Sequence, residues 1–269
     1  MIHAQEPVEN LVDVKIRIEH RKDVLWLTIN TPDSHNTMSA QMLHELAAAF
    51  DSAKHISGLR AIVLTGAGER TFCAGGQLTP SADGNPFELA PEQFDNPVAL
   101  LFRAMDRCDV PIVGKINGSA FGGGVGLVCA CDIAIGVSSA QFGTTEARVG
   151  VFPLMILPLL MRVVSRRDLF EMCFYAEKFN ASKAVERGLL NDAVEPAELA
   201  HAVEAVISKL RLNSPTALKI GRRAINAVTD LSLSDALNTT QALLPLLAQS
   251  AHAKEGFLAF REKRPPVWV

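Results

Sequence analysis

The sequence predicts an α/β fold that ends in an all-helical segment. Between about residues 14 and 143, short apolar runs typical of buried strands alternate with segments whose apolar residues follow helical spacing. From about residue 165 onward every segment predicts helix. With 269 residues, of which 48% are hydrophobic and 20% charged, the chain has the length and apolar content for one large domain with an appendage.

The first predicted elements are a hairpin, a loop and a helix. Alternating apolar and charged residues at 14–18 precede an apolar run at 24–30, which is a hairpin signal. Residues 31–38 predict a loop, because they are rich in side chains that hydrogen-bond to their own backbone. Ser39 is the expected N-cap of a helix that Gly58 follows. The apolar positions of this helix are Met42, Leu43, Leu46, Ala49, Phe50 and Ala53.

Two short apolar segments in the next part of the chain predict strands. Residues 61–65 predict a buried strand, and residues 71–76 form a second apolar step that ends on a glycine pair. Residues 77–97 predict a loop with four prolines. A helix at 98–108 then leads to another buried strand at 110–116.

The segment at residues 117–132 is the most distinctive of the sequence. Three consecutive glycines, from Gly122 to Gly124, connect the preceding strand to a buried helix, which lets the backbone approach another group closely. Further strands are predicted at 132–136 and 140–143. Strand–strand–helix units therefore recur along the chain, although residue identities do not repeat at a fixed period.

The remaining third of the chain predicts a helical module for packing and assembly. The expected helices cover residues 165–176, 182–188, 196–212, 215–228, 232–249 and 252–263. Residues 243–247 are too apolar to be left exposed to water.

Composition excludes several classes of protein. A net charge of −3 without a basic cluster argues against a nucleic-acid partner. The most apolar window, at 149–164, is short and broken by two prolines, so no membrane span is expected. Five cysteines without paired spacing predict reduced thiols in a cytoplasmic protein, and seven scattered histidines predict no metal site. Residues 1–10 lack the apolar core of a secretory signal.

Three features carry the chemistry that the sequence predicts. The glycine steps at 73–76 and 121–124 each follow an apolar strand and can present backbone N–H groups. Two such donors converging on one point would form an oxyanion hole. Glu146, just after a predicted strand, would have a raised pKa if partly buried and could move protons. Each feature also has a plainer interpretation, as a turn needed for packing or as an exposed loop acid.

Two other enzyme classes lack their required sequence context. The dinucleotide-binding pattern G-x-G-x-x-G would need, after Gly122 and Gly124, a third glycine where the chain has Leu127. In dinucleotide-binding proteins an acidic residue follows the next strand, but none follows the strand predicted here at residues 132–136 at the required spacing. The G-x-S-x-G turn of serine hydrolases does not occur.

Taken together and in order, these pieces resemble the enoyl-CoA hydratase/isomerase (crotonase) superfamily. The resemblance covers nearly the whole chain, from about residue 14 to residue 263. The matching segments are residues 29–32 with Asn36, 61–68, 72–76, 111–132, 142–146, 188–194 and 255–260.

The resemblance implies a crotonase-like (ClpP/crotonase) α/β fold, a spiral of ββα units with a C-terminal all-helical domain. Residues 1–200 would form the spiral core, which carries the active site. Residues 201–269 would form the helical domain, which makes trimer contacts and completes the CoA pocket. The implied ligand is an acyl-CoA substrate bound by a homo-trimer or a dimer of trimers. Coenzyme A would enter as part of the substrate, with no separate cofactor.

The resemblance also assigns roles to residues. The backbone N–H groups of Gly76 and Gly123 would be the oxyanion donors, and Glu146 would be the catalytic acid or base. The adenine end of CoA would lie near residues 33–35, and the C-terminal helix would reach the CoA of a neighbouring subunit. The residues expected to bind substrate or CoA are Asp33, Ser34, His35, Ala74, Gln77, Leu78, Gly126, Phe152, Phe260 and Lys263.

Three departures from the family pattern limit this assignment. Hydratases of the family carry a glutamate where this chain has Gly126, and Gln77 replaces a usual aspartate. Bulky residues at 152–156 replace a glycine-rich segment, which predicts either a reshaped, more apolar acyl pocket or packing against the helical domain. A second acid could come from the loop at 77–97, whose candidates are Asp83, Glu88, Glu92 and Asp95.

Three hypotheses for function follow from these features. The sequence motifs as a whole slightly favour an enoyl-CoA hydratase-type enzyme over the other hypotheses. Its substrate would have a branched or substituted acyl chain. A single carboxylate, Glu146, favours a Δ3-Δ2 enoyl-CoA isomerase, because one base can move a proton between C2 and C4. A catalytically silent CoA-ester-binding protein is the hypothesis from another class.

Overall fold

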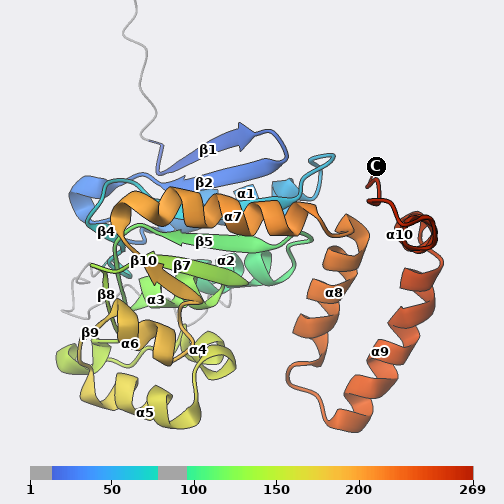
Figure 1. Ribbon diagram of the computed structural model, residues 1–269. Coiled ribbons are helices and arrows are strands. Elements are labelled where there is room, and N and C mark those ends of the chain that lie inside the picture. The colour runs from blue at the N-terminus through green and yellow to red at the C-terminus, as the bar shows by residue number, and fades with distance from the viewer. Residues whose placement is uncertain (1–13, 78–95, 269) are drawn as a thin grey trace, which may run out of the picture.

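Two β-sheets form the centre of the structure (Figure 1). The computed structural model describes residues 14–77 and 96–268. Within these ranges, the larger sheet has six strands in the order β1-β2-β3-β5-β7-β10, and the smaller has four in the order β4-β6-β8-β9. The strands of the larger sheet are β1 (Ile16–Arg21), β2 (Val24–Ile29), β3 (Ala61–Gly66), β5 (Ile112–Ile116), β7 (Ile133–Val137) and β10 (Asp192–Val194). Those of the smaller sheet are β4 (Thr71–Cys73), β6 (Ser119–Phe121), β8 (Gln141–Gly143) and β9 (Phe179–Asn180).

Helices follow the strands in a regular order. The α-helices are α1 (Ala40–Ala53), α2 (Pro97–Asp106), α3 (Gly123–Cys129), α4 (Leu157–Val163), α5 (Arg166–Tyr175), α6 (Ala181–Glu186), α7 (Leu199–Arg211), α8 (Pro215–Val228), α9 (Leu233–Ala248) and α10 (Ala251–Glu262). Short 3-10 helices lie at η1 (Pro32–Ser34), η2 (Glu146–Val149) and η3 (Pro196–Glu198). The expected N-cap is present, since the Ser39 hydroxyl accepts a hydrogen bond from the Met42 N–H at 3.2 Å.

Each turn of the chain passes through both sheets before it enters a helix. The chain runs β3–β4–α2, then β5–β6–α3, then β7–β8 and on to η2 and α4. Successive strands of these turns pair in parallel, β3 with β5 and β5 with β7 in one sheet, and β4 with β6 and β6 with β8 in the other. The predicted crotonase-like spiral of ββα units is therefore confirmed.

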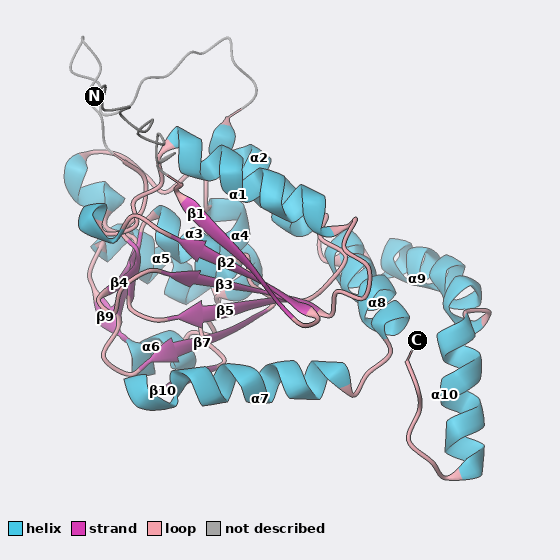
Figure 2. Ribbon diagram, turned by 90° about the horizontal axis from the view of Figure 1, so that it is seen from above, coloured by secondary structure: helices cyan, strands magenta, loops and turns pink. Residues whose placement is uncertain are grey.

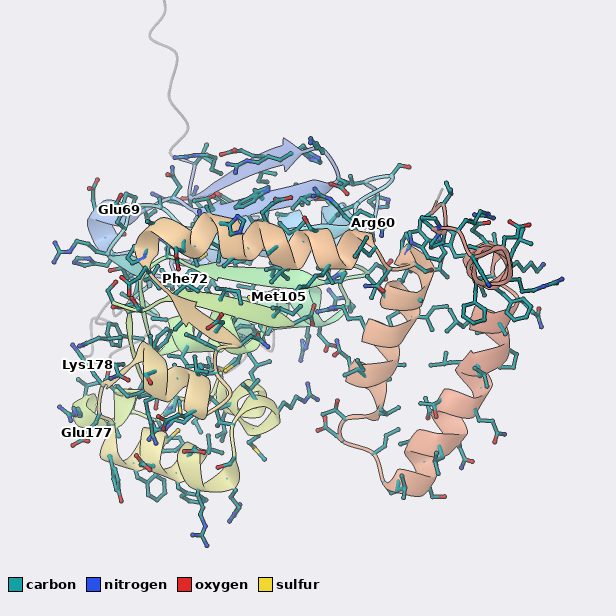
Figure 3. The ribbon with its side chains drawn as sticks, in the orientation of Figure 1. Arg60, Glu69, Phe72, Met105, Glu177 and Lys178 are labelled. Atoms are coloured by element: carbon teal, nitrogen blue, oxygen red, sulfur yellow. The ribbon has the colours of Figure 1, made fainter. Side chains whose placement is uncertain are left out.

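The core lies on both faces of the larger sheet. Figure 2 shows α1 and α2 on one face and α7 on the other. Every residue of β3 is buried, which is typical of a strand covered by helices on both sides. Phe72 of β4 and Met105 of α2, both almost fully buried, lie among the core elements (Figure 3). The full burial of one such side chain contributes about 2 kcal/mol.

The prediction that every segment after residue 165 is helical is wrong in two places. β9 pairs antiparallel with β8, and β10 pairs in parallel with β7. β6 was also not predicted as a separate strand. Each of these strands has only two or three residues, too few to show a period, and each is stabilised by hydrogen bonds to a sheet that already exists.

The C-terminal helices α8 to α10 project away from the two sheets (Figure 1). No residue of α9, which lies wholly in the described part of the chain, is buried. Leu244 and Leu246, from the apolar stretch expected to be covered, are 64% and 65% exposed. The division into residues 1–200 and 201–269 stays a prediction, and α7, which spans that boundary, packs against β5 and β7.

The first turn of α3 packs directly against the end of β4. A Cβ atom on Gly124 would overlap the carbonyl oxygen of Cys73 and lie 2.9 Å from its carbonyl carbon. A Cβ atom on Gly75 would lie 2.8 Å from the carbonyl oxygen of Phe121. The two connections between sheet and helix can therefore approach this closely only because both positions are glycine.

We expect Gly124→Ala to lower the free energy of unfolding by about 3 kcal/mol, because the added methyl group overlaps backbone that cannot move aside. The matched control is Gly221→Ala in α8, where a Cβ atom would meet nothing within 4 Å. That change should be neutral or stabilise by up to about 1 kcal/mol, since alanine favours helix over glycine. Urea unfolding of both variants measures the difference. Equal stability of the two would contradict the close contact.

Candidate functional site

The two glycine steps of the sequence meet at the ends of β4 and β6, which are neighbours in the smaller sheet. A Cβ atom on Gly75 would lie 3.2 Å from the backbone nitrogen of Gly123. A Cβ atom on Gly123 would in turn lie 3.6 Å from the backbone nitrogen of Gly76. The structure thus brings Gly76 and Gly123 together, as the sequence predicted.

The N–H groups of Gly76 and Gly123 are both free to bind a ligand. Met38 donates to the Gly75 carbonyl at 2.8 Å and accepts from the Gln77 N–H at 3.2 Å. This parallel bridge uses the groups on either side of Gly76, so the N–H of Gly76 itself points away from Met38. Gly123 is the first residue of α3, where an N–H has no partner within the helix. Neither N–H has a hydrogen-bond acceptor among residues 14–77 and 96–268.

Glu146 lies beside this pair of donors. It is the first residue of η2, directly after β8, and β8 pairs with β6. A Cβ atom on Gly122 would lie 2.9 Å from Glu146 Oε1 and 3.4 Å from its Cδ. Glycine at 122 therefore leaves room for the carboxyl group, and it also permits a backbone φ of +51°.

The carboxyl group of Glu146 is held away from water. Its Oε2 atom is buried and has no hydrogen-bond partner in the described part of the chain. Burial raises the pKa of Glu146, and a hydrogen bond from its own backbone N–H offsets part of that shift. The plainer interpretation of Glu146 as an exposed loop acid is therefore wrong.

A buried cluster from α5 lies next to Glu146. The Thr144 hydroxyl donates to the carbonyl of Met172 at 2.9 Å, and Cys173 is only 1% exposed. Burial raises the pKa of the Cys173 thiol, and the nearby charge of Glu146 adds to that effect. Thr144 belongs to the segment 142–146 that the sequence singles out, whereas Met172 and Cys173 look like ordinary apolar residues of a helix.

The space next to Gly126 is filled by apolar side chains. Gly126 lies one helical turn after Gly122, so both glycines share a face of α3. A Cβ atom on Gly126 would overlap Ile156 Cγ2 and lie 2.9 Å from Ile156 Cβ and 3.0 Å from Phe102 Cζ. Both of these side chains are buried. No larger residue fits at position 126 unless they move.

Phe152 packs against an aromatic residue of α5. Its ring lies edge-on to Phe174 of α5, with centroids 6.2 Å apart, and the side chain is 37% exposed. Within residues 152–156, it is Ile156 that contacts the glycine face of α3. The segment thus packs against α5 and against the glycine face of α3, whereas the alternative considered from the sequence named the helical domain of residues 201–269.

The loop expected to lie near the adenine of CoA is anchored beside the glycine pair. The Asn36 side chain accepts from the Thr31 N–H and donates to the carbonyls of Ala67 and Thr71 at 3.0 and 2.8 Å. The His35 carbonyl accepts from the Ala74 N–H at 3.1 Å. These bonds hold Asp33, Ser34 and His35 exposed and close to Ala74. Gln77 is exposed next to Gly76.

Other predicted site residues are not brought to this point. Phe260, on α10, is 81% exposed, and Lys263 directly follows that helix. Figure 1 shows α10 at the opposite end of the molecule from β4 and β8. Leu78 and the four loop acids, Asp83, Glu88, Glu92 and Asp95, lie outside the described residues.

The cysteines contribute no reactive thiol to this site. All five are free, and burial raises the pKa of Cys73 and Cys129 to about 12. No group of three or more His, Cys, Asp or Glu side chains within 14–77 and 96–268 is arranged to hold a metal ion. No helix in the same ranges has the length and apolar character to cross a membrane.

Comparison with known proteins agrees with this architecture. The sequence model of the enoyl-CoA hydratase/isomerase family matches residues 19–269. The short-chain-enoyl-CoA hydratase of Clostridium acetobutylicum is 30% identical over 248 residues, which cover 92% of this chain and 94% of that protein. The (E)-benzylidenesuccinyl-CoA hydratase of Thauera aromatica is 29% identical over 257 residues, covering 94% and 98%.

Solved structures show the same fold. The crystal structure of an enoyl-CoA hydratase from Mycobacterium smegmatis superposes with a TM-score of 0.89 at 28% identity. The match covers 95% of this chain and 99% of that one. Family match, relatives and fold agree, so this chain is a member of the enoyl-CoA hydratase/isomerase family in the crotonase superfamily.

Proposed function

We propose that this protein acts on an enoyl-CoA thioester whose carbonyl oxygen accepts hydrogen bonds from the N–H groups of Gly76 and Gly123. The support is that these two donors lie side by side without an acceptor among the described residues. Negative charge develops on a thioester oxygen when its α-carbon gains enolate character, and fixed N–H donors stabilise that charge.

Glu146 is the proton carrier in this proposal. The observation that carries the proposal is its buried Oε2 atom, which has no partner among the described residues and lies beside the two free N–H groups. Burial raises its pKa, which makes the carboxylate a stronger base than that of an exposed glutamate and suits it to accept a proton and return it.

Hydration is the first candidate reaction. Water would add to C3 while Glu146 takes one of its protons, and the protonated carboxyl group would then give a proton to C2 of the enolate. One carboxyl group therefore serves both steps. The names of the Clostridium and Thauera relatives support a hydratase, and the Thauera name supports a substituted acyl chain.

Double-bond isomerisation is the second candidate, and the filled space next to Gly126 favours it. A water held for hydration needs polar partners, whereas Ile156 and Phe102 offer methyl and phenyl groups there. A Δ3-Δ2 isomerase needs no water, since Glu146 alone can remove a proton from C2 and return it at C4, or the reverse.

The protein is proposed to work as a homo-trimer or a dimer of trimers. The exposed apolar residues of the C-terminal arm, helices α8 to α10, support this assembly. They include Leu233, Leu237, Leu244, Leu246, Phe257 and Phe260. A neighbouring chain would cover them, and Phe260 and Lys263 would then contact its CoA.

The remaining parts of the proposal concern the ligand and the cell. Coenzyme A enters as part of the substrate, its adenine near Asp33, Ser34 and His35, with Ala74, Gln77 and Leu78 along the chain of the ligand. No separate cofactor is proposed. Reduced cysteines support a cytoplasmic location.

The central test is turnover of crotonyl-CoA and of a 3-enoyl-CoA by the wild-type protein and by Glu146→Gln. We expect the variant to lose at least about 100-fold in kcat on whichever substrate reacts, because the amide cannot carry the proton. Hydration of crotonyl-CoA would identify a one-carboxylate hydratase, and conversion of only the 3-enoyl substrate an isomerase.

The control is Glu198→Gln, an exposed acid on η3, which should keep wild-type rates. If Glu146→Gln is fully active, Glu146 is not the proton carrier. Binding of CoA esters without turnover of either substrate would point to a catalytically silent protein.

The rate should depend on pH through Glu146. Burial raises its pKa, so the carboxylate that removes a proton is lost at a higher pH than for an ordinary glutamate, whose pKa is about 4.3. We therefore expect kcat to fall on acidification with a midpoint above that value. A kcat profile from about pH 4.5 to about pH 9, with circular dichroism at each pH as a folding control, measures it. A fall of kcat with a midpoint at or below the pKa of an ordinary glutamate would contradict the effect of burial on the pKa of Glu146.

Assembly should depend on the apolar face of α9. Leu244, 64% exposed in one chain, is expected to be buried between chains, so Leu244→Lys should dissociate the trimer. Light scattering after size exclusion reads the mass directly. Asn238→Lys, an exposed polar residue of the same helix, is the matched control and should leave the mass unchanged. A wild-type protein with the mass of one chain would refute the proposed assembly.

A further inference from the structure

Arg222 joins the C-terminal arm to the rest of the molecule through a buried guanidinium group. It lies on α8 and is 8% exposed, and no other residue of this wholly described helix is buried. Its Nε donates to Asp132 Oδ2 at 2.7 Å. The other donors reach three backbone carbonyls at the end of α2: Met105 at 2.9 Å, Asp106 at 2.9 Å and Cys108 at 2.6 Å.

The partners of Arg222 belong to the two helices that border the candidate site. Met105 and Asp106 are the last residues of α2. Asp132 follows the end of α3 by three residues, and its Oδ2 atom also accepts the Ile112 N–H of β5 at 2.7 Å. One guanidinium group therefore fixes α2 relative to the turn after α3.

Few residues separate the hydrogen bonds of Arg222 from the candidate site. Met105 lies one helical turn after Phe102, and the Phe102 ring contacts Gly126. Gly126 shares a face of α3 with Gly122, against which the Glu146 carboxyl group lies. A shift of α2 would thus change the packing next to the group that carries the proton.

The hydrogen bonds of Arg222 cannot easily be replaced by other contacts of α8. The last carbonyls of a helix carry partial negative charge and lack partners within the helix, so a buried cation satisfies them well. Lys219 and Arg223 pair with Asp109 from the same side of α8, but they are 46% and 58% exposed. Such exposed ion pairs contribute little. Asn226 of α8 donates to one of the same carbonyls, that of Asp106, at 3.2 Å, but its amide is neutral.

We propose that Arg222 is a positioning residue for the candidate site: it holds α2 against α3, and thereby Phe102 against Gly126 and the first turn of α3 against Glu146. The C-terminal arm thus acts on the site through Arg222, the one residue of the wholly described helix α8 that is buried. The kinetic consequence rests on the proposed function, whereas the structural consequence does not.

The first test compares Arg222→Met, Arg222→Lys and the control Arg223→Met. We expect Arg222→Met to lower kcat by about tenfold to a hundredfold, as a displacement near the reacting groups does, with a smaller change in KM. Arg222→Lys should recover part of the loss, and Arg223→Met should match the wild type. Hydrogen exchange of amides 122–126 should become faster in Arg222→Met and stay unchanged in Arg223→Met.

A double-mutant cycle with Phe102→Leu tests whether Arg222 acts on the site through Phe102. If Arg222 acts through Phe102, the double variant Arg222→Met/Phe102→Leu should have the same kcat as Phe102→Leu alone. If the losses in kcat of the two single variants multiply fully in the double variant, Arg222 does not act through Phe102. Wild-type kcat, KM and exchange in a folded Arg222→Met would overturn the proposal.

The same experiments remain informative if Arg222→Met does not fold or if the wild-type protein is inactive. If Arg222→Met does not fold, Arg222→Lys takes its place in the cycle, because it keeps the charge but loses most of the donors. If the wild-type protein turns over no enoyl-CoA, the proposed function fails. The exchange of amides 122–126 then still decides the role of Arg222.

Discussion

The direct contact between the backbone of β4 and the first turn of α3 is the constraint on which the candidate site depends. Because neither Gly75 nor Gly124 carries a side chain, the two connections approach to the contact distance of their main-chain atoms. The pairing of β4 with β6 then fixes the direction of both segments. Two N–H groups that are far apart in the sequence therefore lie side by side without any side chain to position them.

The candidate site combines a few polar groups with apolar walls. Next to the first turn of α3, its polar groups among the described residues include main-chain donors and the carboxyl group of Glu146, whose pKa burial raises. The walls come from apolar side chains, Ile156 and Phe102 along α3. In the proposed function such an arrangement would separate tasks: the backbone would stabilise charge, one acid would move the proton, and the apolar walls would select the acyl group.

Much of the fold could be predicted from the sequence because its elements have strong local signals. The buried strand β3 and the amphipathic helix α1 with its Ser39 cap show clear periodicity. The glycines at 122–124 also predicted the turn, in which Gly122 has the positive φ that few other residues adopt. β9 and β10 could not be predicted, because their hydrogen bonds depend on strands more than 35 residues away.

The same distinction applies to the site. The two glycine steps and Glu146 were recognisable because each follows a predicted strand, and the family resemblance then assigned Gly76 and Gly123 as the donors. The segment 152–156 was identified, but its contact with Gly126 through Ile156 was not, and neither was Phe102, since both reach Gly126 from other parts of the chain and look like ordinary core residues. Arg222 was not identified either, because nothing in the sequence of an amphipathic helix indicates that one arginine points inward.

The partners of Arg222 have a consequence for how such a sequence can change over evolution. Three of its four acceptors among the described residues are main-chain carbonyls, which every amino acid supplies. Side chains at 105, 106 and 108 are therefore free to vary as far as this contact is concerned. Arg222 and Asp132 are not, since no other pair of side chains offers the same charge and the same set of donors. In a set of divergent sequences, this junction would appear as two invariant positions 90 residues apart, surrounded by variable ones.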